Sequence, residues 1–189
     1  MNIAVVGQPG AWSTERLADA LRAAGARVGV VDLAACSLRL PDRRLFHRGA
    51  PLEKLDGAVV KKLGDTADGW GVQERIGMLR HLEASGIPVL SAPDRLHVAV
   101  NRYRMTCELV RAGLPVPETT ITEDVDEAAA SVERFGSAVL KPLFTSKGRG
   151  MRRLEPSREL RSQLESHRDD GLGPFYLQRF VKHLSLIHI

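Results

Sequence analysis

Short apolar segments with the character of buried strands alternate with helical segments through the first half of the chain, and this alternation restricts the fold more than any other feature. The expected strands cover residues 3–6, 28–33, 57–62 and 87–90. One expected helix begins at a Ser13 cap, and a second covers residues 72–84. Parallel strands need long crossover connections, usually helices. The sequence therefore predicts an α/β fold with a doubly wound parallel sheet, with a hairpin near Asp42 inserted.

The composition is that of a packed globular protein. Hydrophobic residues make up 43% of the 189 residues and charged residues 26%, whereas disordered chains combine low hydrophobicity with high net charge. No apolar run approaches the roughly 18 residues of a membrane span, and a basic secretory start is absent, so a cytoplasmic protein without a membrane partner is expected. Cys36 and Cys107, expected as small buried side chains, suggest neither a disulfide framework nor a zinc cluster.

The pattern changes near Pro93, where we expect a domain boundary. A helix capped by Asn101 follows, and later a strand over 138–142 and another over 151–154 flank a loop over 145–150. This arrangement predicts a hairpin with a basic tip. A last strand is expected over 175–181.

The hairpin tip has the strongest local charge in the sequence. From Arg134 to Arg153 there are six basic residues and no acidic one, although the whole chain has a net charge of only +4. Glycines let backbone N–H groups approach phosphate oxygens, and a strand lysine adds a point charge from the side. Lys141 and the loop therefore suit a triphosphate, while a solvated turn is an equally good explanation of the tip alone.

A second turn with glycines, residues 7–10, follows the first strand. A dinucleotide fingerprint would need glycines where Pro9 and Trp12 stand, and nothing matches a P-loop. We expect an ordinary turn, with a substrate-contacting loop as the alternative, because ligands of such sheets bind at the carboxyl ends of the strands. Lys61 and Lys62 are candidates for substrate contact, or simply an exposed strand edge.

Several motifs occur in a fixed order, and together they are more specific than any one alone. They are Asn101-Arg102-Tyr103-Arg104, Gly113-Leu114-Pro115-Val116-Pro117, the strand lysine Lys141, the basic loop and Gln178-Arg179-Phe180-Val181. This order resembles the ATP-grasp superfamily, specifically its RimK-like carboxylate–amine ligases. The resemblance implies a Rossmann-like pre-ATP-grasp domain over 1–93, then the first α+β subdomain of an ATP-grasp fold over 94–183, truncated before the second.

The resemblance also implies a nucleotide site. Lys141 would contact the phosphates, and Arg102 stands where the family has another phosphate-contacting lysine, unless it is a solvated surface arginine. The carbonyl of Arg179, a position that is usually acidic in the family, would accept a hydrogen bond from the adenine amino group, unless Arg179 is likewise a solvated surface arginine. The Val181 amide would donate to the ring. The remaining implied site residues are Ser146, Lys147, Gly148, Arg149 and Gly150 in the loop and Gln178 at the start of the hinge.

The implied activity is ATP-dependent ligation. ATP converts a carboxylate into an acyl phosphate, and the amine of an amino-acid or peptide substrate attacks it to give an amide. Mg²⁺ would bridge the phosphates, held by residues of the second subdomain, so this chain alone is expected to be inactive. A non-catalytic nucleotide-binding or interaction module is the alternative; self-association is left open, and a nucleic-acid partner is not expected because aromatics are scarce beside the basic cluster.

The last residues have a different origin in our interpretation. Leu184-Ser185-Leu186-Ile187-His188-Ile189 matches the translation of CTGTCTCTTATACACATC, the end of a transposase adapter used to prepare sequencing libraries. Native sequence is therefore expected to end at His183, and residues 184–189 to be an artefactual tail. The alternative is a short strand with imperfect alternation.

Overall fold

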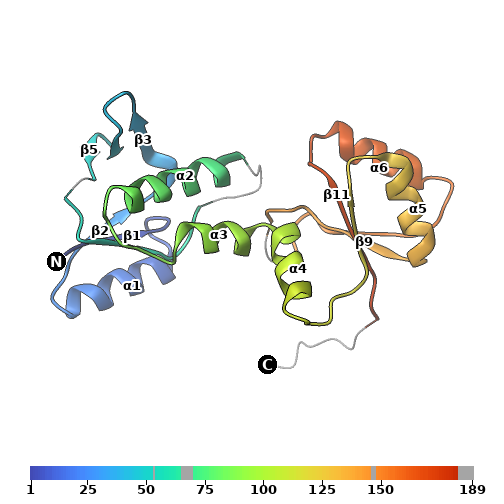
Figure 1. Cartoon of the computed structure of the whole chain (residues 1–189), viewed down its shortest axis with the longest axis horizontal. Coiled ribbons are helices and arrows are strands. Elements are labelled where there is room, and N and C mark those ends of the chain that lie inside the picture. The colour runs from blue at the N-terminus through green and yellow to red at the C-terminus, as the bar shows by residue number, and fades with distance from the viewer. Residues whose placement is uncertain (53, 65–69, 146–147, 183–189) are drawn as a thin grey trace. The chain divides into compact units, whose positions relative to one another are not determined.

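The computed structural model describes residues 1–52, 54–64, 70–145 and 148–182 (Figure 1). The expected tail and the loop residues Ser146 and Lys147 lie outside this part. The chain divides into two compact units, Met1–Ala99 and Val100–Ile189, which we call unit 1 and unit 2. Each unit has its own sheet, and each is described by itself.

Unit 1 contains the parallel sheet that the alternation predicts. Its strands are β1 (Asn2–Val6), β2 (Arg27–Val31), β6 (Gly57–Val60) and β7 (Val89–Leu90), in the order β2-β1-β6-β7. All neighbouring pairs are parallel, and Val6 of β1 lies opposite Val31 on one side and Val60 on the other. Helix α1 (Trp12–Ala23) connects β1 to β2, α2 (Trp70–Ala84) connects β6 to β7, and α3 (Pro93–Val100) follows β7 (Figure 1).

The start of α1 differs from the prediction. The helix is preceded by Ala11, which has no side-chain cap, so the predicted cap at Ser13 is wrong. Glu15 in the first turn instead accepts a hydrogen bond from the backbone N–H of Gly10, at 2.8 Å. A carboxylate near the N-terminal end of a helix is stabilised by the helix dipole, and Glu15 also ties the turn before the helix to its first turn.

Strand β2 also ends before the predicted Leu33. The Asp32 carboxylate accepts from the N–H of Ala34, at 3.1 Å, and begins the 3₁₀ turn η1 (Leu33–Ala35). Cys36 and Cys107 are only partly buried, contrary to expectation. Burial, followed by the charge of Asp32, raises the pKa of the Cys36 thiol to about 11.

The predicted hairpin near Asp42 is confirmed and belongs to a small antiparallel sheet. The strands are β3 (Cys36–Arg39), β4 (Arg44–His47) and β5 (Ala50–Pro51). The guanidinium of Arg39 lies 3.9 Å from the centre of the Phe46 ring. Such cation–π contacts stabilise exposed arginines modestly.

Unit 2 is built on an antiparallel sheet. Its elements are α4 (Arg102–Arg111), β8 (Thr119–Thr122), α5 (Val125–Phe135), β9 (Ala138–Leu140), β10 (Arg152–Leu154), α6 (Leu160–Asp169) and β11 (Phe175–Arg179). The strand order is β10-β9-β11-β8. The predicted hairpin of β9 and β10 is confirmed, whereas β8 is a strand that the sequence analysis did not predict.

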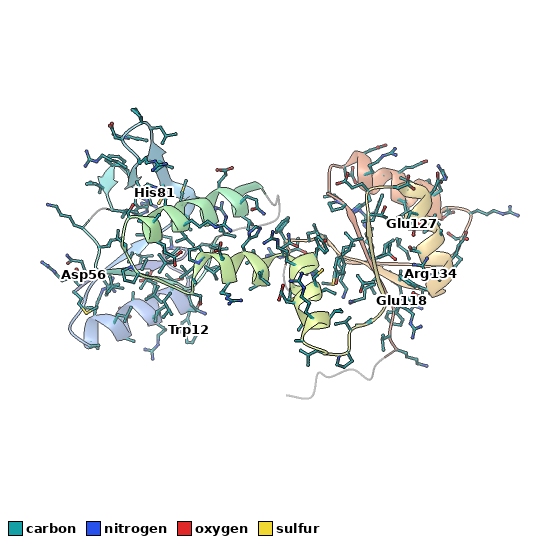
Figure 2. The ribbon with its side chains drawn as sticks, in the orientation of Figure 1. Trp12, Asp56, His81, Glu118, Glu127 and Arg134 are labelled. Atoms are coloured by element: carbon teal, nitrogen blue, oxygen red, sulfur yellow. The ribbon has the colours of Figure 1, made fainter. Side chains whose placement is uncertain are left out.

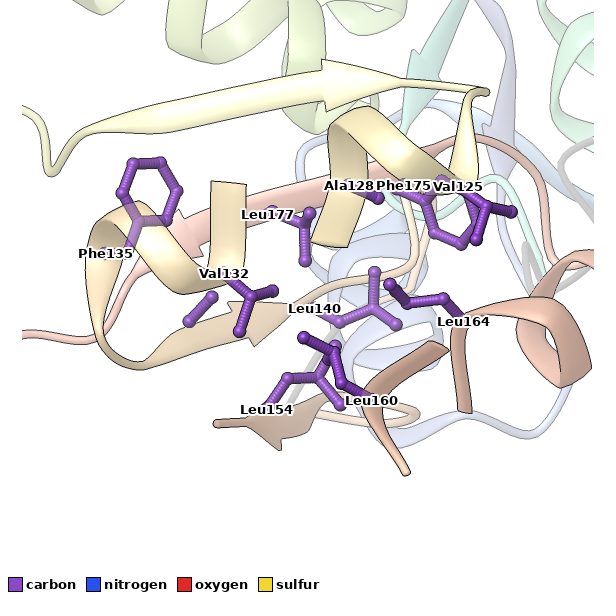
Figure 3. Close-up of a cluster of buried hydrophobic side chains, with 11 residues drawn as sticks. Val125, Ala128, Val132, Phe135, Leu140, Leu154, Leu160, Leu164, Phe175 and Leu177 are labelled. Carbon is purple, nitrogen blue, oxygen red and sulfur yellow. The ribbon is translucent and has the colours of Figure 1, made fainter. Parts of the chain in front are cut away.

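The core of unit 2 lies between one face of this sheet and helices α5 and α6 (Figure 3). Leu140 and Leu177 lie opposite each other on β9 and β11 and point into the core. Helix α5 ends at Gly136, whose φ of 70° is a left-handed conformation that favours glycine. One face of each strand is therefore committed to packing, and the alternate residues face away from the core.

Among the described residues, no helix is long and apolar enough to cross a lipid bilayer.

Candidate nucleotide-binding site

Lys141 lies on the face of the unit 2 sheet that points away from the core. Leu140 before it is buried, so alternation turns Lys141 to the opposite face, together with Gln178. The Lys141 ammonium donates a hydrogen bond to Oε1 of Gln178. Gln178 Nε2 in turn donates to Oγ1 of Thr119 on β8, at 3.1 Å. Three neighbouring strands thus hold the ammonium in one position.

Helix α4 brings a second cation to the same region. Arg102 Nη2 donates to the carbonyl of Thr145, at 2.6 Å, and Nη1 donates to the carbonyl of Pro142. The Arg102 backbone N–H also donates to the carbonyl of Leu143, at 3.2 Å. Arg102 therefore holds the backbone between β9 and the basic loop.

The same helix is attached to β11 by a buried contact. Thr106 and Tyr176, both buried, share a hydrogen bond of 2.6 Å between their hydroxyl groups. Asn101 caps the helix, as predicted, by accepting from the N–H of Arg104. These contacts fix the position of Arg102 relative to Lys141.

The charged forms of Lys141 and Arg102 are both destabilised by their surroundings. Partial burial, and next the positive charge of Arg102, lower the pKa of Lys141 below its ordinary value. Partial burial also lowers the pKa of Arg102. Within the described part of the chain no carboxylate forms an ion pair with either residue. An anion bound between them would be stabilised by both charges.

The loop after β9 is closed at its base. Thr145 Oγ1 donates to the carbonyl of Arg149, at 2.8 Å, and the N–H of Met151 donates to the carbonyl of Gly148, at 3.3 Å. Gly150 has a φ of 70°, and a Cβ there would lie 3.0 Å from Cγ of Pro142. A side chain at this position would be strained by the backbone conformation and crowded by Pro142.

Part of the positive charge around the loop is already balanced. Arg134 Nε lies 3.4 Å from Oε1 of Glu118, and both residues are labelled in Figure 2. Arg153 forms an ion pair with Glu155, at 2.6 Å. The charge of the six basic residues is thus not all directed to a ligand, whereas the Lys141 ammonium is hydrogen-bonded to Gln178 of the neighbouring strand.

The predicted hinge continues from β11. The N–H of Arg179 donates to the carbonyl of Glu118, and the N–H of Phe180 donates to the carbonyl of Ser137, both at 2.8 Å. The Arg153 guanidinium lies 4.2 Å from the centre of the Phe180 ring. Val181 is half exposed beyond the strand. The adenine contacts assigned to Arg179 and Val181 stay predictions.

Sequence reasoning missed Thr119 and did not predict Pro142 and Thr145 as hydrogen-bond partners of Arg102. Thr119 orients Gln178, while Pro142 and Thr145 provide the carbonyls that Arg102 binds. The β-branched run of β8 was the available signal for Thr119. In the described residues no group of three or more His, Cys, Asp or Glu side chains is placed to hold a metal ion.

Residues 1–96 match the family model of the RimK PreATP-grasp domain. The chain belongs to the RimK-like ATP-grasp family. It is 34% identical over 153 residues to a tetrahydromethanopterin:alpha-L-glutamate ligase of Methanosarcina acetivorans, a match that covers 78% of this chain and 47% of the relative. The chain thus spans about half the length of the curated relatives it matches first.

Solved structures support the same fold. An ATP-grasp RimK domain protein from Sphaerobacter thermophilus superposes with a TM-score of 0.74 at 21% identity, covering 96% of this chain and 64% of that one. The ATP-grasp ligase PsnB, in a complex with a precursor variant, Mg and ADP, gives a TM-score of 0.62 at 21% identity, with coverages of 95% and 65%. At these identities the likeness establishes the fold alone.

Proposed function

We propose that the protein to which this chain belongs is an ATP-dependent carboxylate–amine ligase, and that unit 2 binds the nucleotide phosphates. The observation that carries the proposal is the pair of half-buried cations, Lys141 and Arg102, with no carboxylate partner in the described residues. The family membership of the chain and the ligase names of its relatives support the same conclusion.

In this proposal each residue has a distinct role. Lys141, oriented by Gln178, contributes a fixed charge to the phosphates, and the hinge from Gln178 to Val181 offers backbone groups to adenine. Arg102 acts mainly by holding the loop base, because both terminal nitrogens of its guanidinium donate to loop carbonyls. Gly148, Arg149 and Gly150 belong to the loop that closes over the phosphates, together with the proposed contributions of Ser146 and Lys147.

The chemistry that follows is phosphoryl transfer and then acyl transfer. A substrate carboxylate oxygen attacks the γ-phosphorus of ATP, ADP leaves, and an acyl phosphate remains. An amine then attacks the acyl carbon, phosphate leaves, and an amide forms with loss of a proton. Mg²⁺, when bound, would neutralise charge on the transferring phosphate. Because the relatives are glutamate ligases, we propose an amino acid such as L-glutamate as the amine.

The experiment is a calorimetric titration of the 189-residue chain with ATP. Lys141→Met removes a charge-assisted contact, so the ATP dissociation constant should rise at least about tenfold. Lys54→Met is the matched control, because Lys54 is an exposed lysine of unit 1, and its ATP affinity should equal that of the parent chain.

The outcome separates the ligase from the alternative module. No saturable ATP binding, or an equal loss in both variants, would remove the nucleotide site. ATP binding without ADP release, in the presence of carboxylate and amine substrates and with the complete gene product, would favour a non-catalytic nucleotide-binding module.

A further inference from the structure

Unit 1 has a polar site of its own at the point where its strand order reverses. Strands β1 and β6 are neighbours in the sheet. The chain continues from β1 to β2 on one side and from β6 to β7 on the opposite side. In open parallel sheets, ligands bind outside the carboxyl ends of the strands at such a reversal. A ligand of unit 1 would therefore bind at the segments that follow β1 and β6.

The two segments are tied to each other at this edge. The backbone N–H groups of Lys61 and Lys62 both donate to the carbonyl of Val6, at 2.9 and 3.1 Å. The Lys62 ammonium then reaches across and donates to Oε1 of Gln8, at 2.6 Å. The exposed Lys62 side chain thus crosses the point of reversal and lies beside the turn after β1.

Tight packing fixes the backbone on the β1 side. A Cβ on Gly7 would lie 2.6 Å from Oγ1 of Thr14, which is fully buried and has no hydrogen-bond partner. Gln8 therefore follows a backbone position that cannot move without disturbing α1. Glu15 already engages the N–H of Gly10, so the helix end is balanced by an acid of this chain.

The β6 side is fixed by α2. Arg75 Nη1 donates to the carbonyl of Leu63, at 3.1 Å, and the Leu63 side chain is buried. Gly64 has a φ of 96° and lies against the same guanidinium. Lys62 is consequently held between two anchored segments, and in the described residues its recorded partner is the neutral amide of Gln8.

We propose that Lys62 and Gln8 bind the carboxylate of the amino-acid substrate. One carboxylate oxygen accepts from the Lys62 ammonium, and the other accepts from the Gln8 amide nitrogen after the side chain reorients. An ammonium and one amide match the two oxygens of a planar carboxylate, whereas the phosphates of a nucleotide call for more donors than this edge supplies. This assignment rests on the proposed ligase function, since it names where that enzyme holds its substrate.

The test is a titration of the nitrogen-labelled 189-residue chain with L-glutamate in the absence of nucleotide. The NMR chemical shifts of the backbone amides are monitored during the titration. Saturable shifts are expected at Gly7, Gln8, Lys62 and Gly64. Lys62→Met should raise the dissociation constant at least about tenfold, because a charged donor is lost. Lys61→Met, which alters the adjacent exposed lysine, should change it less than about twofold, and a dispersed spectrum confirms that each variant is folded.

Three results would overturn the assignment: no saturable shift at these amides, an equal loss in Lys61→Met, or inorganic phosphate binding as tightly as L-glutamate at equal ionic strength. Gln8→Leu gives a second check, since it should weaken glutamate binding while leaving the Lys62 charge in place. An ATP titration of the same samples separates the two proposals. An unmutated chain that binds L-glutamate but not ATP contradicts the nucleotide site alone, and an unmutated chain that binds ATP but not L-glutamate contradicts this assignment alone.

Discussion

Each unit of the protein pairs a lysine ammonium with a glutamine side-chain oxygen, but the two pairs have different surroundings. In unit 2, Lys141 and Gln178 are half buried on the face of an antiparallel sheet, and this burial, followed by the charge of Arg102, lowers the pKa of Lys141. In unit 1, Lys62 is exposed at the end of a parallel strand and contacts Gln8. Burial and a second cation favour a highly charged anion, whereas a single exposed ammonium suits a carboxylate.

The loops beside the two lysines also differ in what holds them. The turn after β1 is held by packing, because Thr14 fills the space beside Gly7. The loop after β9 is held by hydrogen bonds from Arg102 to backbone carbonyls. Mutations should therefore affect the first loop through volume and the second through lost donors.

The largest expected effect tests the packed turn. Gly7→Ala places a methyl group against a buried threonine and should lower the free energy of unfolding by about 1–3 kcal/mol, as overpacking does. Gly29→Ala is the control: Gly29 has no heavy atom within 4 Å of an added Cβ, and reduced chain entropy should raise stability by about 0.4–1 kcal/mol. Urea titration measures both, and a neutral Gly7→Ala would contradict the tight turn.

The next effect tests the hydrogen-bonded loop. Arg102→Met leaves the half-buried carbonyls of Pro142 and Thr145 without these donors and should destabilise the loop by about 1 kcal/mol. Amide hydrogen exchange of Met151, which donates to Gly148, should accelerate roughly fivefold. The exposed neighbour Arg104 provides the control variant Arg104→Met. Unchanged exchange in Arg102→Met would show that the loop holds itself together.

The smallest effect concerns a histidine of the unit 2 core. His167 is buried, neither ring nitrogen has a hydrogen-bond partner, and its ring centre lies 5.5 Å from that of Phe175. Burial, and next the charge of Arg152, lower its pKa below the ordinary 6.5. The unfolded chain therefore binds the proton more readily, and stability is lost as the pH falls through and below 6.5.

This loss has an upper bound. Between pH 8 and pH 6, one such group changes the free energy of unfolding by at most about 0.8 kcal/mol. His167→Phe should remove that part of the pH dependence, while His81→Gln in unit 1 should leave it in place. Denaturant titrations at the two pH values measure the free energy of unfolding. If this free energy changes with pH in His167→Phe as it does in the unmutated chain, a neutral buried imidazole is contradicted.

Much of the fold was predictable because its signals are local. The strand–helix alternation predicted the parallel sheet of unit 1, and Asn101 marked a helix start correctly. Strand β8 was missed because its residues, Thr119-Thr120-Ile121-Thr122, show no alternation of apolar and polar side chains. Its extended form is stabilised by pairing with β11, a partner distant in sequence.

The sequence by itself indicated the family and the strand–helix order of the unit 1 sheet, and it singled out Lys141 as a phosphate contact, which stays a prediction. Only the tertiary structure decided what surrounds that lysine. Gln178 is 37 positions from Lys141 in the sequence. The carbonyls that accept from Arg102 are 40 and 43 positions from Arg102. Such contacts depend on strand order and register, and residue patterns along the chain encode local conformation but not which distant side chains become neighbours.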